Sequence, residues 1–281
     1  MTTVQTPSEF RQLCKQNKFT SNTSGYVPGY AQANVLILPK ELADDFINLC
    51  ERNPVPCPLL AKTELGFPNK LNNNQFIKTD NDNDDEDDNF DLRTDLPKYK
   101  IFRNSKFIKE VDDISKYWDL NDHIGFLIGC SFSFENELIK SNLKPKNILL
   151  NSNVSMYITK KMLNSSGVFI NCPYVVSMRP YKLKDIEKVR DITRNFKKTH
   201  GEPIDWGYDA IERLGINDIN NPEFGDKCKI DDDEIPVFWA CGVTTQAAAL
   251  TASKNCNSYI FSHSPGHMLI LDIKDSDINN L

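Results

Sequence analysis

The stretch NVLILPKELADDFINLCERN, residues 34–53, decides the fold class. Its first six residues form a continuous apolar run, which is typical of a buried strand. In the remainder, Leu42, Phe46 and Leu49 recur at helical spacing and Pro54 follows, so we predict a helix that ends before the proline. A strand that leads directly into a helix is the repeating unit of α/β proteins.

The same order of strand and helix returns further along the chain. Apolar runs at 123–130 and 235–242 are each followed by a helical pattern, at 131–142 and 244–254. The other predicted elements are a hairpin at 98–111, strands at 154–159 and 173–180, a helix at 183–198 and two strands within 258–273. We therefore predict an α/β fold of mixed sheets with packed helices, and the sequence shows no internal repeat.

The net charge of −6 is concentrated in one segment. Residues 80–91, DNDNDDEDDNFD, carry eight acids and no base, so without them the net charge changes from −6 to +2. A nearly neutral body has no basic surface, and we predict no nucleic-acid partner. We interpret residues 69–91 as a mobile acidic insertion, too poor in apolar residues to hold a core position. A calcium loop of the EF-hand type is excluded because Asp85 stands where that loop needs glycine.

Neither a membrane span nor a targeting segment is apparent in the sequence. No run approaches the roughly 18 uninterrupted apolar residues of a membrane span. Residues 1–16 lack the apolar core of a signal peptide and are not rich in arginine like a transit peptide. Thr6-Pro7-Ser8-Glu9 instead predicts the capped start of a helix. We expect a soluble cytoplasmic protein with no membrane partner, and a mitochondrial location stays open.

The cysteines indicate no metal centre. Eight are spread over the chain, and no pair has the Cys-x-x-Cys spacing of zinc ribbons or redox motifs. Several lie in apolar runs, where cysteine usually acts as a small hydrophobic residue. We predict no cofactor, and the spacing gives no support to a divalent metal.

Two junctions between a strand and a helix are candidate binding sites, because ligands of α/β proteins commonly bind where loops meet helix N-termini. The candidate substrate-binding residues there are Cys130, Ser131, Ser133, Gly242, Thr244, Thr245 and Gln246. Small side chains, hydroxyls and free N–H groups suit an anion or an oxyanion. Glu135 and Cys241 are candidate catalytic groups, Cys241 as a nucleophile activated by the helix N-terminus. The alternatives are helix capping by the hydroxyls and a buried structural cysteine.

A third junction is the stretch SHSPGHMLILDI, residues 262–273, which contains His263 and His267. Pro265 and Gly266 forbid a helix there, so the two histidines flank a turn and cannot bind a metal from one helical face. Structural roles, acid–base catalysis and, as the weakest reading, metal binding stay open.

Arg179 ends the apolar strand predicted at 173–180. An arginine in that place can bind a substrate carboxylate through two parallel hydrogen bonds. The alternative is a structural ion pair with one of the many acids of the chain.

Seven segments, taken in order, carry a family resemblance. They are GYVPGYAQANVLILPKELADDF (25–46), RNPVPCPLL (52–60), RTDLPKY (93–99), FLIGCSFSFE (126–135), VVSMRP (175–180), PVFWACGVTTQAA (236–248) and HSPGHML (263–269). Together they resemble the D-glutamate cyclase family, whose bacterial members often carry only a provisional hydro-lyase label. The resemblance runs from about Phe19 to Asp272 and implies an α/β fold with two closely associated lobes in a single domain, 1–281. We expect one lobe of about 1–115 with 180–281, and an inserted lobe of about 116–179.

The resemblance implies the reversible loss of water from D-glutamate to give 5-oxo-D-proline. In that reaction we expect Arg179 to hold the α-carboxylate, and His263 or His267 to move a proton from the amine to the leaving oxygen. N–H groups at the two strand–helix junctions would hold the oxyanion. Glu135 would orient an imidazole or act as the base itself.

The sequence departs from the family pattern at several positions. Ile158 stands where an arginine is expected, and Thr244-Thr245-Gln246 replaces Thr-Pro-Gln. Two alternatives therefore stay open: a hydro-lyase acting on another small carboxylic acid, and a carboxylate-binding or interaction protein without catalysis. In each reading the partner is a small carboxylate or amino acid, and the sequence indicates no oligomeric state.

Overall fold

The computed structural model describes residues 4–78 and 90–280, in which every strand pair is antiparallel. The larger of two sheets has the order β3-β2-β6-β1-β11-β4-β5, and β12 also pairs with β1. Its strands are β1 (Tyr30–Pro39), β2 (Leu59–Glu64), β3 (Phe67–Leu71), β4 (Tyr99–Arg103), β5 (Lys106–Val111), β6 (His123–Gly129), β11 (Tyr259–His263) and β12 (Leu269–Lys274).

The smaller sheet, of order β7-β8-β10-β9, comes from the middle of the chain. Its strands are β7 (Ser155–Met162), β8 (Pro173–Lys182), β9 (Asp205–Trp206) and β10 (Glu234–Ala240). The chain passes to this sheet after β6 and leaves it after β10, which differs from the lobe boundaries expected near residues 116 and 179. The division into lobes itself stays a prediction.

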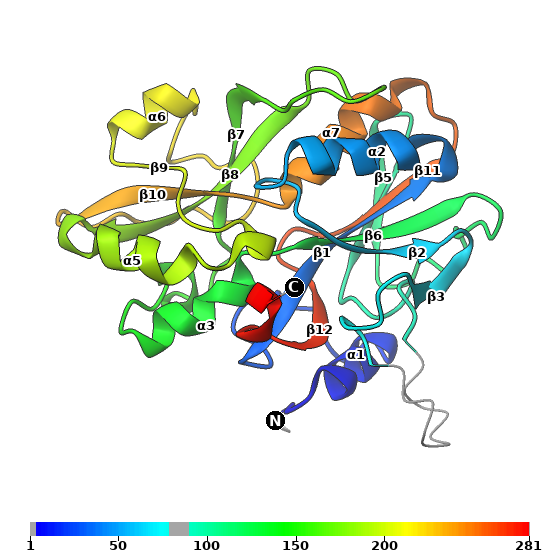
Figure 1. Cartoon of the computed structure of the whole chain (residues 1–281), viewed down its shortest axis with the longest axis horizontal. Helices are drawn as coiled ribbons and strands as arrows, with labels where there is room; N and C mark the ends of the chain where they lie inside the picture. The colour runs from blue at the N-terminus through cyan, green and yellow to red at the C-terminus, as the bar shows by residue number, and fades with distance from the viewer. Residues whose placement is uncertain (1–3, 79–89, 281) are drawn as a thin grey trace.

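Helices cover both faces of the sheets. They are α1 (Pro7–Lys15), α2 (Lys40–Arg52), α3 (Phe132–Lys140), α4 (Lys146–Leu149), α5 (Ile186–Thr193), α6 (Asp209–Leu214) and α7 (Val243–Ala252). In Figure 1, α2 and α7 lie above the strands, and α3 and α5 lie below them. One hydrophobic core contains Phe134 of α3 and Val189 of α5, and a second contains Phe46 of α2 and Ala248 of α7.

Both cores include strand residues from both sheets. Val35 and Ile37 of β1 enter the core beside α3 and α5, whereas Leu36 and Leu38 enter the opposite core. Successive side chains of a strand point to opposite faces, so a strand covered on both faces is apolar throughout. This is the physical reason for the apolar run at 34–39, and the predicted α/β class is confirmed.

Several elements predicted from the sequence are confirmed, and others were not predicted. The capping box is present, because the Thr6 hydroxyl accepts the Glu9 N–H while the Glu9 carboxylate accepts the Thr6 N–H. The hairpin is confirmed as β4 and β5, and both strand–helix junctions are confirmed. The sequence analysis missed β2, β3 and β9, whose polar residues interrupt the apolar pattern. Among the described residues, no helix is long and apolar enough to cross a membrane.

The segment interpreted as a mobile insertion, residues 69–91, is anchored on both sides of its acidic centre. Phe76, Ile77 and Phe90 are buried members of the core beside α3 and α5. The prediction that this segment holds no core position is therefore wrong for its ends, because a few apolar side chains suffice where the local composition is polar. Residues 79–89, and with them the predicted mobility, lie outside the described residues.

The two sheets repeat one arrangement. Strands β1 and β6 precede α3, and strands β8 and β10 precede α7. Ala33 pairs with Gly129 and Val176 pairs with Ala240, and the second residue of each pair directly precedes a cysteine. The outer neighbours also match, since β2 and β9 pair with β6 and β10, while β11 and β7 pair with β1 and β8. The sequence shows no repeat of amino acids. The structure adds a repeat of another kind, in the topology and register of the strands.

Candidate functional site

The first junction (residues 129–135) and the second junction (residues 240–246) meet at one small cavity, the seam cavity. Its volume is about 10 Å³, which is room for a single water-sized group. It is lined by Asn34, Cys130, Ser131, Phe132, Asn153, Val154, Met156, Cys241, Gly242, Val243, Gly266 and Met268. The third junction contributes Gly266 and Met268 to this lining. All three junctions therefore meet at the seam cavity, the third through its turn.

The two helices begin in the same way beside the seam cavity. Ser131 (φ −61°, ψ −16°) and Gly242 (φ −64°, ψ −18°) are the N-caps of α3 and α7, and within the described residues neither makes a side-chain cap hydrogen bond. The Phe132 N–H donates to the Cys130 thiol at 3.5 Å. The following N–H groups are also paired locally, since those of Ser133 and Thr244 donate to the carbonyl oxygens of Cys130 and Cys241 at 3.1 and 3.0 Å.

Both cysteines at the helix starts are thiols rather than thiolates at neutral pH. Burial raises the pKa of Cys130 well above its usual value, and burial raises the pKa of Cys241 to about 11. The nearby Arg179 guanidinium acts in the opposite direction on both cysteines, but its effect is smaller. Cys241, predicted as a nucleophile, is therefore better suited to donate a proton than to attack.

Two of the predicted binding hydroxyls tie their helices to neighbouring strands. The Ser133 hydroxyl lies 3.0 Å from the N–H and 3.3 Å from the carbonyl oxygen of Gln32 in β1. The Thr244 hydroxyl lies 3.0 Å from the N–H and 3.2 Å from the carbonyl oxygen of Val175 in β8. These two hydroxyls therefore bind strand backbone and do not cap their helices, which was the alternative considered from the sequence.

The next two predicted residues of the second junction are also buried. The Thr245 hydroxyl donates to the Gly242 carbonyl at 2.8 Å, which is a local helix contact. Oε1 of Gln246 is buried and has no hydrogen-bond partner within the described residues.

Arg179 and Glu135 form an ion pair that is fully buried. The guanidinium donates from Nε and Nη2 to Oε1 of Glu135, at 3.1 and 2.7 Å, and from Nη2 to the Ser131 hydroxyl at 3.0 Å. It also packs over the rings of Phe134 and Trp239. Arg179 was predicted to clamp the substrate, but the structure has the alternative, an internal ion pair that holds the start of α3.

A second cavity, the loop cavity, lies on the other side of Phe132, which lines both cavities. Its volume is about 50 Å³. It is lined by residues 25–30 and by Gln32, Phe132, Glu135, Asn136, Ile139, Ile148 and Asp275. Two buried carboxyl groups thus line one cavity, and Oε2 of Glu135 also accepts a hydrogen bond from the Ser24 hydroxyl at 3.0 Å.

Asp275 is a site residue that the sequence analysis missed. It follows β12, its carboxylate accepts a hydrogen bond from the Asn136 amide at 3.1 Å, and burial raises its pKa. Only its position after a strand end could have suggested it. The loop across the cavity is strained, because Val27 has a positive φ of 45° that a β-branched residue rarely adopts.

The two histidines of the third junction do not line either cavity. Nδ1 of His263 lies 3.1 Å from both the N–H and the carbonyl oxygen of Val35, and burial lowers the His263 pKa to about 4. The His267 ring lies 3.1 Å from the Pro265 carbonyl oxygen and 3.3 Å from that of Thr20. Both rings bond to the backbone, which favours the structural role among those left open by the sequence.

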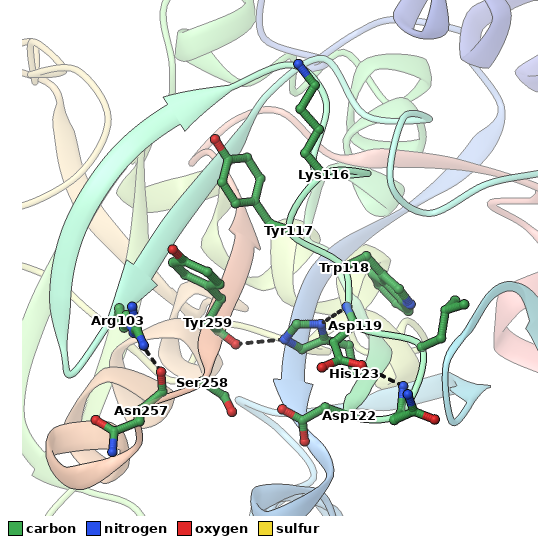
Figure 2. Close-up of a pocket in the computed structure, with 12 residues that line it drawn as sticks. Arg103, Lys116, Tyr117, Trp118, Asp119, Asp122, His123, Asn257, Ser258 and Tyr259 are labelled. Atoms are coloured by element: carbon green, nitrogen blue, oxygen red, sulfur yellow. Dashed lines mark hydrogen bonds between the residues drawn. The ribbon is translucent and has the colours of Figure 1, made fainter.

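A wider cleft of about 490 Å³ lies elsewhere on the molecule and is drawn in Figure 2. Its central imidazole, His123, accepts the Asp119 N–H at Nδ1 and lies 3.1 Å from the Tyr259 carbonyl oxygen at Nε2. With both ring nitrogens engaged, this histidine fixes the backbone of the cleft. None of the predicted site residues lines the cleft.

Within the described residues, no group of three or more histidine, cysteine and carboxylate side chains is placed to hold a metal ion. The seam and loop cavities are therefore the candidate site, because they unite the first, second and third junctions with a buried acidic pair. The site can hold an anionic group at the helix starts and a cationic group beside the carboxyls.

Comparison with known proteins shows the family of this chain. The sequence pattern described as D-glutamate cyclase matches residues 124–272, which include all three junctions. The chain belongs to the D-glutamate cyclase family. The structure of a nitrogen repressor-like protein from Methanococcus jannaschii aligns with 88% of each chain at 12% identity and a TM-score of 0.34, too low to support any conclusion.

Relatives of this D-glutamate cyclase family member carry the provisional name hydro-lyase. A Schizosaccharomyces pombe protein is 42% identical over 96% of this chain and 85% of its own length. Proteins from Staphylococcus haemolyticus and Bacillus subtilis are each 42% identical, over 98% and 97% of this chain and 97% and 98% of their own lengths. The family and these names support a hydro-lyase.

Proposed function

We propose that the protein interconverts D-glutamate and 5-oxo-D-proline with loss of water, acting as a D-glutamate cyclase. Family membership is the observation that carries this proposal, because the match covers all three junctions and the named relatives span nearly the whole chain. The chemistry is assigned to the seam cavity and the loop cavity on either side of Phe132.

The amine of the substrate fits the loop cavity. Glu135 and Asp275 both line that cavity, and two buried carboxyl groups favour a cationic ligand. Because burial raises the pKa of Asp275, this carboxyl exchanges a proton with an amine more readily than an exposed aspartate does. Glu135 acts through its charge, since it is held by Arg179.

The side-chain carboxyl of the substrate fits the seam cavity. The N-terminal ends of α3 and α7 there carry the positive ends of two helix dipoles, which favour the oxyanion that forms when the amine adds to the carboxyl carbon. The Cys241 thiol is a proton source at the same place. Arg179 is a positioning residue, and the histidines His263 and His267 have no acid–base role in this proposal because neither lines a cavity.

Ring closure forms a C–N bond and breaks a C–OH bond, and the proton released by the amine leaves with the hydroxide as water. Holding the substrate folded makes the attack intramolecular, which can correspond to an effective molarity of about 10⁵ M or more. The two cavities are too small for glutamate as they stand, at about 10 and 50 Å³. Phe132 and the loop 24–30 therefore have to move when the substrate enters.

The test is incubation of the purified protein with D-glutamate, L-glutamate and 5-oxo-D-proline, with chiral chromatography of the products. We expect interconversion of the D-forms, and a loss of about 10²-fold or more in kcat/KM for Asp275→Asn and Glu135→Gln. Glu137→Gln is the matched control, because Glu137 lies on the same helix and pairs with Lys140 at the surface. A folded protein that converts none of the three compounds would refute the proposal.

A hydro-lyase that acts on another small carboxylic acid is the second candidate. Ile158, which stands where the family resemblance implies arginine, packs against the cluster of buried residues that surrounds the seam cavity. An apolar side chain at this place changes what the wall of the site can bind. A substrate panel of small hydroxy and amino dicarboxylic acids separates the two candidates.

A further inference from the structure

Sulfur-containing residues are concentrated in the lining of the seam cavity. The chain has eight cysteines and five methionines, and two of each line this one cavity of about 10 Å³: Cys130, Cys241, Met156 and Met268. All four belong to one compact cluster of buried residues. They come from four separate parts of the chain, so neither their spacing nor a sequence motif predicts that they lie together.

Two thiols and two thioethers are a ligand set of a particular kind. Such soft donors select soft cations such as Cu(I), whereas Mg²⁺ and Ca²⁺ require oxygen ligands. Methionine also fills irregular gaps in cores. That packing role does not explain why two of the three buried methionines in the described residues share a cavity with both helix-start thiols.

The surroundings compensate the charge that such a ligand set would carry. The Arg179 guanidinium donates a hydrogen bond to the hydroxyl of Ser131, the residue after Cys130, so a positive charge lies beside the first junction. The Phe132 N–H donates to the Cys130 sulfur, and both cysteines directly precede helix starts, where negative charge is stabilised.

We propose that the seam cavity binds one Cu(I) ion through the sulfur atoms of Cys130, Cys241, Met156 and Met268. Each thiol that becomes a ligand releases its proton to solvent, and no electron is transferred. The cavity already has the volume of one small group, so a single ion fits without repacking the cluster. Binding of Cu(I) does not depend on the proposed function, but the ion would occupy the place assigned there to the substrate carboxyl and would therefore inhibit the proposed reaction.

The experiment is an anaerobic titration of the full-length protein with Cu(I), in competition with a chromogenic Cu(I) chelator. Ultraviolet absorption of copper–thiolate bonds gives a second readout. Loss of outer-sphere partners alone costs metal sites about 10–100-fold in affinity. We therefore expect Cys130→Ser/Cys241→Ser to lower the affinity by about 100-fold or more, and Met156→Leu/Met268→Leu, which conserves volume, by about 10-fold.

The matched control uses another pair of buried thiols. Cys50 and Cys57 interact with each other in the core beside α2, away from the seam cavity. Cys50→Ser/Cys57→Ser should keep the tight site. The proposal is overturned if this control loses the Cu(I) affinity, or if both seam variants bind Cu(I) as tightly as the unmodified chain. The methionine variant keeps the test informative if the cysteine variant does not fold, and neither readout needs enzymatic activity.

Discussion

The two strand–helix junctions have the same backbone conformation but differ in charge: the first contains a buried ion pair, and the second a neutral amide. Each has a cysteine after the strand, an N-cap in nearly the same conformation, and a hydroxyl two residues later that ties the helix to the neighbouring strand. At the first junction the next polar position is Glu135, which is paired with Arg179. The matching position at the second junction, four residues after the N-cap, is Gln246, whose Oε1 has no partner within the described residues.

The strand register shows that this difference in charge also involves the strands beside the junctions. Arg179 lies three residues after Val176 in β8, and Leu36 lies three residues after Ala33 in β1, so the two side chains occupy matching places in the repeat. One half therefore has a buried ion pair where the other has a leucine and an amide. The same backbone accommodates either solution, and only the charged half presents a carboxyl group to a cavity.

The largest expected effect comes from breaking the buried pair. Arg179→Leu leaves Glu135 as an uncompensated buried charge, and we expect the free energy of unfolding to fall by about 3–5 kcal/mol. Arg179→Leu/Glu135→Gln gives the first junction the side chains of the second. The double variant should be more stable than Arg179→Leu alone, because no buried charge remains. Urea unfolding of the single and double variants measures both, and strictly additive losses would contradict the comparison.

Acid should weaken the first junction through His200. Burial lowers the His200 pKa to about 4, so the imidazole is neutral in the folded state but gains a proton near pH 6.5 when unfolded. The free energy of unfolding therefore falls as the pH drops from about 6.5 to 4, by about 3 kcal/mol from this residue. The segment that contains His200 packs against Gly129, at the start of the first junction.

His200→Asn isolates this contribution. Asparagine tolerates the positive φ of 87° at this position and does not titrate in that range. The variant should lose less stability than the unmodified chain between pH 6.5 and 4, as measured by urea unfolding at several pH values. Equal pH dependence of the two proteins would show that His200 does not contribute. His263, whose pKa burial also lowers to about 4, is present in both proteins and cancels in the difference.

The sequence supported the α/β class and the position of the junctions because the signal there is local. The apolar runs at 34–39 and 123–130 follow from burial on both faces, which β1 and β6 share. The prediction that residues 69–91 hold no core position was wrong because composition describes the segment as a whole. Single side chains such as Phe76 and Phe90 nevertheless enter the core.

The site was harder to predict from the sequence because its chemistry depends on contacts between residues that are far apart in the chain. Arg179 and Glu135 are 44 positions apart, and His263 bonds to the backbone of Val35, 228 positions away. No spacing rule tells whether an arginine at a strand end meets a substrate or an internal acid. Asp275 gave no signal beyond following a strand, and its burial is a tertiary property.

The smallest expected effect is that of Gly242→Ala, and it is compared with Gly129→Ala because the two glycines of the junctions touch different groups. A Cβ at Gly129 would overlap the backbone carbonyl of Lys198, whereas a Cβ at Gly242 would overlap the side-chain amide of Asn34. Neither glycine has a positive φ, so the cost of alanine is steric. Backbone cannot yield without moving its neighbours, so we expect Gly129→Ala to cost more than the roughly 1–3 kcal/mol typical of overpacking, and Gly242→Ala to cost about 1–2 kcal/mol.

Asn34 provides the decisive control for this last comparison. Its amide donates to the Gly129 carbonyl at 2.8 Å, so rotating it away from a new methyl group sacrifices one buried hydrogen bond. Once Asn34→Ala has removed that amide, adding Gly242→Ala should cost almost nothing, while adding Gly129→Ala should cost as much as before. Urea unfolding of the two double variants measures this. If Gly242→Ala kept its full cost without Asn34, the close approach of the two junctions through this side chain would be disproved.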